Sequence, residues 1–172
     1  APGLRRIIEK FPTLHDKALT PNMHFMVSVL NGIFGDFFLK QHNPLALPMV
    51  LYDHYGSIQK GELTGRVVIM VHGLCMSHLS WSNNRYSGVG ERLLAQRDNN
   101  TMLYLNYNSG RRISANGRSF ANLLEELVQQ NPKITSIDLI GHSMGGLVSR
   151  SALFYGKQNL YQWIHMTENL VC

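Results

Sequence analysis

Short apolar runs alternate along the chain with segments whose apolar residues recur at helical spacing. Strand patterns lie at 66–71, 101–107 and 134–140. The first of them is a continuous run rich in β-branched residues, typical of a strand buried on both faces of a parallel sheet. Each of the three patterns is followed by a segment with a helical period, at about 82–96, 114–130 and 146–155. Ser114 is the expected N-cap of the second helix. Further strand patterns lie within 47–58 and from 168 onward. This alternation predicts an α/β fold with a doubly wound, mainly parallel sheet.

The most apolar part of the sequence, residues 23–40, precedes this alternation. It contains an apolar stripe at helical spacing, which consists of Met26, Leu30, Ile33 and Phe37. A bilayer span needs ~20 mostly apolar residues, and this segment also carries polar side chains, so a span is the least favoured of three interpretations. The first interpretation is a helix packed on the body of the fold. The second is a helix that lies on a membrane surface or covers a lipid-binding cleft.

The N-terminal part is expected to be helical as a whole. A short amphipathic helix is predicted before Pro12, and Pro44 and Pro48 disfavour a continuation of the apolar helix. We therefore expect a helical extension at residues 1–46 and the α/β core at residues 47–172.

Gly141-His142-Ser143-Met144-Gly145 stands between the last long strand pattern and the helix pattern that follows it. This is a G-x-S-x-G motif, in the strand–turn–helix context that gives the motif its meaning. Ser143 is expected at a sharp turn with a strained backbone. Gly141 and Gly145 fit this turn, because a Cβ at either position would collide with the other limb. Ser143 is therefore the candidate nucleophile.

A second motif, Val71-His72-Gly73-Leu74, follows the strand pattern at 66–71. Together with the serine motif, it makes residues 66–155 resemble the first half of an α/β-hydrolase of the lipase/esterase branch. The resemblance implies hydrolysis of carboxylic esters by acyl transfer, with Ser143 as the nucleophile. An acyltransferase of the same fold would use the same chemistry.

The resemblance also implies an oxyanion hole. The N–H of Met144 begins the helix after the nucleophile, where it has no intrahelical acceptor. The second donor is implied to be the N–H of Leu74, and Gly73 would let this loop turn close to the substrate. His72 is implied to orient the loop and not to act as the base. His142, which directly precedes Ser143 in the sharp turn, is expected to be a packing or rim residue.

Other candidate side chains carry weaker signals. His78 could contact substrate but is expected on the surface. Asp138 is expected at a solvated strand end or as a structural partner at the far end of the sheet. Arg111 and Arg112 could border the cleft, although a solvated loop is favoured. No set of histidines, cysteines or carboxylates has metal-ligand spacing, so neither a metal nor another cofactor is expected.

The acid and the base that the resemblance implies would both follow Cys172 in chain order. By itself the chain is therefore expected to be inactive, and the remainder of the same protein or a complementing chain is expected to supply these groups. A hydrolase-fold fragment could instead act as a non-catalytic binding or membrane-associated module. The expected partners are a small-molecule or lipid ester and a membrane surface contacted through residues 23–40.

Charge and cysteine content bear on the expected partners and on the compartment. The net charge is +5 without a long basic run, which favours a modestly basic surface and argues against nucleic-acid binding. The two cysteines, Cys75 and Cys172, do not make a disulfide framework and favour a reducing compartment. A cytoplasmic or peripheral membrane location is accordingly preferred.

Overall fold

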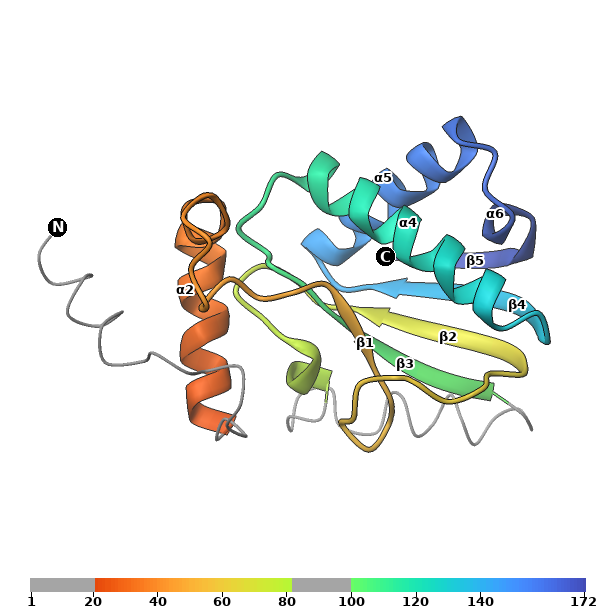
Figure 1. The fold of residues 1–172 in the computed structure, drawn as a ribbon, viewed down its shortest axis with the longest axis horizontal. Helices are drawn as coiled ribbons and strands as arrows, with labels where there is room; N and C mark the ends of the chain where they lie inside the picture. Colours follow the sequence, from red (N-terminus) through yellow and green to blue (C-terminus); the bar gives the residue numbers. More distant parts are fainter. Residues whose placement is uncertain (1–20, 82–99) are drawn as a thin grey trace, which may run out of the picture.

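The computed structural model describes residues 21–81 and 100–172. Within these ranges, helices pack against a five-stranded sheet (Figure 1). The elements in chain order are α2 (Pro21–Lys40), β1 (Val50–Tyr52), β2 (Gly65–Val71), the 3-10 helix η1 (His78–Trp81), β3 (Asn100–Asn106), α4 (Ile113–Gln130), β4 (Ile134–Gly141), α5 (Met144–Gln158), α6 (Trp163–Met166) and β5 (Thr167–Val171). The helices expected before Pro12 and at 82–96 lie outside the described residues.

The strands are ordered β1-β3-β2-β4-β5 across the sheet. β2 pairs in parallel with both β3 and β4, and β4 pairs in parallel with β5, whereas β1 lies antiparallel beside β3. The prediction of a mainly parallel α/β sheet is confirmed. Because the carboxyl ends of parallel strands meet at one edge of a sheet, the segments that follow β2, β3 and β4 gather there.

The apolar runs become strands whose side chains enter two separate layers, as the two-residue period of a strand requires. One layer, packed against α4 and α5, includes Val67, Ile69, Val71, Phe120, Leu124 and Val148. The layer on the opposite face of the sheet contains Val68, Met70, Met102 and Trp81. This double burial holds β2 and β4 in place, and the loops at the carboxyl edge depart from these two strands.

The helix after β3 has a different N-terminus from the predicted one. Ser114 is not its N-cap, because α4 starts one residue before it and Arg112 occupies the capping position without a side-chain hydrogen bond. The preceding turn explains the difference. The carbonyl of Asn108 accepts hydrogen bonds from the Arg111 N–H (3.3 Å) and from the Asn116 side-chain amide (2.9 Å). These bonds turn the chain into the helix before Ser114 is reached.

Residues 23–40 form the predicted helix, α2, which stands across the carboxyl edge of the sheet (Figure 1). The side of α2 that packs on the body consists of Val27, Ser28, Asn31, Gly35 and Phe38. The Asn31 amide donates to the carbonyls of Val27 (2.9 Å) and Leu45 (2.7 Å) and accepts from the Leu47 N–H (2.9 Å). Packing of this helix on the body, the first of the three interpretations, is therefore present.

Within the part of the chain that the structure describes, no helix has both the length and the hydropathy that are needed to cross a bilayer.

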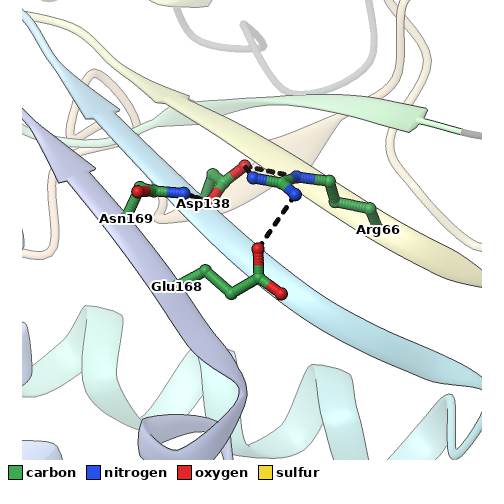
Figure 2. A network of polar contacts seen from close by, with 4 residues as sticks. All are labelled: Arg66, Asp138, Glu168 and Asn169. Carbon is green, nitrogen blue, oxygen red and sulfur yellow. Dashed lines mark hydrogen bonds and ion pairs between the residues drawn. The ribbon is translucent and has the colours of Figure 1, made fainter. Parts of the chain in front are cut away.

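Asp138 is a structural partner within the sheet and not a solvated strand end (Figure 2). Its carboxylate accepts hydrogen bonds from Arg66 Nε (2.6 Å) and from Asn169 Nδ2 (2.8 Å). Arg66 also pairs with the Glu168 carboxylate (2.9 Å). Because these side chains come from β2, β4 and β5, the network ties three adjacent strands together.

Candidate active site

Ser143 stands at the turn between β4 and α5. Its backbone has φ +54° and ψ −121°, a combination that L-residues rarely adopt and that lies outside the left-handed helical region. The residue is exposed, and its side chain makes no capping hydrogen bond to α5. The expected sharp and strained turn is therefore present, with a serine displayed on it.

Gly141 and Gly145 allow the two limbs of this turn to meet. A Cβ at Gly141 would lie 2.5 Å from both the Cα and the nitrogen of Gly146. A Cβ at Gly145 would overlap the carbonyl oxygens of Val71 and His72. A side chain at either position would force α5 away from β4 or from the loop after β2, so the geometry requires glycine at both.

The loop after β2 lies against the serine turn. The parallel pairing of β2 with β4 sets Val71 opposite Gly141, so both motifs begin at the same level of the sheet. The His142 N–H donates to the Val71 carbonyl (2.9 Å), and a Cβ at Gly73 would be 3.2 Å from the His142 carbonyl oxygen. Two motifs that lie far apart in the sequence are thus brought into direct contact.

His72 is completely buried in this loop. Its Nδ1 lies 2.9 Å from the Gly73 carbonyl oxygen, and its ring stacks on Tyr107 with 4.3 Å between ring centroids. Burial lowers the pKa of His72 to about 4, against the opposing effect of the Gly73 hydrogen bond. The imidazole is therefore neutral at neutral pH and donates from Nδ1. An enclosed, neutral ring bonded to its own loop fits the orienting role better than that of a base facing solvent.

Two backbone donors in these loops are unused. No acceptor among residues 21–81 and 100–172 receives a hydrogen bond from the N–H of Leu74 or of Met144. Three nearby N–H groups are engaged: Cys75 donates to Ser109 Oγ (3.0 Å), Gly145 to the His142 carbonyl (2.9 Å) and Gly146 to the Ser143 carbonyl (3.0 Å). An oxyanion hole requires such unused N–H donors, which hydrogen-bond to the oxygen that becomes negative in the transition state.

Two further histidines pack inside the fold. His142 lies edge-on against Trp81, with 6.4 Å between ring centroids, in accord with a packing or rim residue. His78 is buried, so the expectation of a surface position is wrong. It begins η1, which turns it inward, where its Nδ1 lies 3.2 Å from Asn106 Oδ1 and its ring stacks on Tyr52. Burial lowers the pKa of His78 to about 4.

The described residues supply no partner that would activate the serine. Among residues 21–81 and 100–172, no histidine or carboxylate hydrogen-bonds to the Ser143 hydroxyl, and no three potential metal ligands cluster together. Arg111 turns toward α4 and donates to Ser119 Oγ (3.5 Å), while Arg112 is exposed. The two arginines therefore match the solvated-loop alternative.

Sequence reasoning missed two residues that hold the loop after β2. The Tyr107 hydroxyl donates to the His72 carbonyl (2.6 Å), and Ser109 Oγ accepts from the Cys75 N–H (3.0 Å). Both residues follow β3, at the same edge of the sheet as the two motifs. The only available signal was this position at a strand end, because neither residue belongs to a motif.

Comparison with known proteins places this geometry in a family. Residues 62–172 match the family model described as PGAP1-like alpha/beta domain. No curated protein matches the chain. Among solved structures, the mature form of the Bacillus licheniformis lipase BlEst2 is 20% identical over 72% of this chain and 44% of that chain, with a TM-score of 0.50. The Pyrobaculum calidifontis esterase is 15% identical over 95% of this chain and 55% of that chain, with a TM-score of 0.42.

The likeness to BlEst2 shows a shared fold, and this chain spans less than half the length of that lipase. The family match covers more than half of the chain and includes strands β2 to β5 with both loop motifs. The chain therefore belongs to the PGAP1-like alpha/beta domain family and has an α/β-hydrolase-like fold.

Proposed function

We propose that this chain contributes the nucleophile and the oxyanion site of a serine hydrolase that cleaves carboxylic esters. One observation carries the proposal: Ser143 is exposed at positive φ on a strand–helix turn, and the loop that holds His72 and Gly73 packs directly against that turn. Backbone strain that the surrounding structure maintains is typical of a nucleophile elbow.

In the proposed reaction, the Ser143 oxygen attacks the ester carbonyl carbon and the developing oxyanion accepts hydrogen bonds from the N–H groups of Leu74 and Met144. A base outside the described residues takes the serine proton and returns it to the leaving alcohol. Water then attacks the acyl-enzyme and releases the acid. Loss of one oxyanion donor typically costs about 3–4 kcal/mol of transition-state stabilisation.

A lipid-like acyl group is the substrate that the surroundings of the serine favour. Leu74, on the loop of the proposed oxyanion site, and Leu147, one helical turn after Ser143, are both large apolar residues that are exposed to solvent. Because exposed apolar side chains beside a reactive group gain free energy when they cover hydrocarbon, they favour acyl chains over short polar acids.

The test is the Ser143→Ala variant of the full-length protein, assayed with p-nitrophenyl esters of increasing acyl length and with a fluorophosphonate label. We expect the variant to lose the label and to lose on the order of 10⁶-fold in kcat. Ser114→Ala, at an exposed position in the first turn of α4, is the matched control and should keep both.

The same assay separates the alternatives. Transfer of the acyl group to an added alcohol in preference to water would identify an acyltransferase. If the parent protein neither hydrolyses esters nor takes the label, the proposal is wrong and the non-catalytic binding module is the remaining function.

A further inference from the structure

The stripe of α2 that predicted this helix points away from the body of the protein. Met26 is 61% exposed, Ile33 63% and Phe37 47%, and Leu30 is partly exposed between them. Residues three and four apart lie on one side of a helix, so these four side chains form one continuous outward face, the α2 stripe.

The opposite side of α2 is already packed on the loops at the carboxyl edge of the sheet. Gly32 contacts Cys75 and Gly35 contacts Asn108, so closely that a Cβ at either glycine would overlap its neighbour. The packed side combines apolar, small and polar residues, whereas the α2 stripe consists of large apolar side chains alone. A contiguous exposed apolar face of this kind marks an interaction surface.

The charges around α2 indicate what covers the stripe. The helix and the segments that it contacts, 41–49, 72–81 and 106–112, carry three basic side chains, Lys40, Arg111 and Arg112, and a single acidic one, Asp36. Lys40 and Arg112 are exposed. A second copy of the chain docked through this face would bring the same cations together, which disfavours a symmetric dimer.

We infer that the α2 stripe lies on an anionic lipid surface, with Lys40, one turn after Phe37, beside the headgroups. A helix with apolar side chains directed into the acyl boundary and cations at its margin is typical of interfacial binding. The inference does not depend on hydrolysis, because α2 would bind lipid whether or not Ser143 is a nucleophile.

The test is co-sedimentation of the full-length protein with vesicles of phosphatidylcholine alone and of phosphatidylcholine mixed with phosphatidylglycerol. We expect binding to the mixed vesicles that weakens as salt is raised. The double variant Ile33→Gln/Phe37→Gln should lower the partition coefficient roughly tenfold or more. Lys40→Gln should lower it roughly fivefold on the mixed vesicles.

The matched control is Phe154→Gln/Leu160→Gln, which removes two equally large, exposed apolar side chains from another surface and should bind like the parent. The substituted side chains are all exposed, so circular dichroism should show unchanged folding for every variant. The inference is overturned if the parent does not bind the mixed vesicles or if the stripe variant binds as tightly as the parent. It is also overturned if the parent self-associates without binding lipid and the stripe variant is monomeric, since the stripe would then be a contact between copies.

Discussion

At the scale of single residues, Tyr107 fixes the loop of the proposed oxyanion site from behind. Its hydroxyl donates to the His72 carbonyl (2.6 Å), and its ring stacks on the His72 imidazole. Burial raises the pKa of Tyr107 above its usual range, so the hydroxyl keeps its proton and remains a donor. The side chain therefore holds both the peptide and the ring of His72, one residue before Gly73.

The Tyr107→Phe variant removes this hydrogen bond and keeps the stacked ring. It leaves a buried carbonyl without its partner, so the free energy of unfolding should fall by about 1–2 kcal/mol. If the loop supplies an oxyanion donor, kcat of the full-length enzyme should fall roughly tenfold with little change in KM, because the loop would be misplaced in the transition state. Urea denaturation and steady-state ester hydrolysis measure the two effects.

Tyr161→Phe is the matched control for Tyr107→Phe. The Tyr161 hydroxyl donates to Asn122 Oδ1 (2.9 Å) at an exposed position, so its loss should change the free energy of unfolding by less than about 0.5 kcal/mol. A Tyr107→Phe enzyme with unchanged kcat would show that this hydrogen bond does not position the reacting groups.

The contrast between the elbow and Tyr107 shows which residues a sequence can reveal. Gly141, Ser143 and Gly145 are recognisable because their constraint is local, a sharp turn within five residues. Tyr107 acts on His72 from 35 positions away along the chain. No spacing rule links the two residues, so their contact becomes apparent only when β2 is paired with β3.

At the scale of whole elements, α2 shows that a periodic pattern predicts a helix but not its orientation. The stripe of large apolar residues predicted the helix, whereas the packed side uses small and polar residues such as Asn31 and Gly35. These residues face the body because they fit it closely: Asn31 supplies three hydrogen bonds and Gly35 allows contact with Asn108. Tight packing and satisfied polar groups decide the buried side here, and hydrophobicity alone does not reveal them.

The ion-pair network of Asp138 acts at the same scale, because it joins three strands. The Arg66 and Asp138 side chains are only 19% and 11% exposed. Asp138→Asn would leave a largely buried guanidinium with only the half-exposed Glu168 carboxylate as a charged partner, so we expect the free energy of unfolding to fall by about 2–4 kcal/mol. Chemical denaturation of the full-length protein measures this change.

A surface ion pair in the same sheet region serves as the control for Asp138→Asn. Lys133 and Glu62 lie 2.7 Å apart with side chains 65% and 63% exposed, so Glu62→Gln should cost less than about 0.5 kcal/mol. Equal losses for the two variants would contradict a stabilising role for the strand network. Replacement of both buried partners, Arg66→Met/Asp138→Leu, should recover part of the loss, because no buried charge is left unpaired and Glu168 is half-exposed.

At the scale of the whole molecule, the fold was predictable because the two periodicities of the chain are distinct. Short strand patterns and helical spacing alternate, and this alternation permits few topologies other than a wound parallel sheet. The antiparallel direction of β1 was not predictable. This strand has three residues, too few for a pattern, and its direction depends on contact with β3. The sequence placed the candidate serine and its loop correctly at one edge, but the side chains that support them depend on the assembled sheet.

The pH dependence of stability is a further property of the whole molecule. Burial lowers the pKa of His72 and of His78 to about 4, and it also lowers the pKa of His24, whose ring lies edge-on to His78. The ordinary value of 6.5 applies to the unfolded chain, so the unfolded state binds more protons as the pH falls below 6.5. The stabilisation is thus complete above this pH and is lost progressively as the pH falls toward about 4.

We therefore expect the free energy of unfolding to be nearly constant above pH ~7 and to decrease below pH ~6.5, by at most about 1.4 kcal/mol per pH unit for each buried histidine. Urea titrations between pH ~5 and ~7.5 lie above the range in which ordinary carboxylates titrate, so they isolate the histidines. His78→Phe keeps the stack on Tyr52 and should reduce the slope by the share of one histidine. A parent protein with no slope in this window would show that these rings take up protons as readily in the folded state as in the unfolded chain.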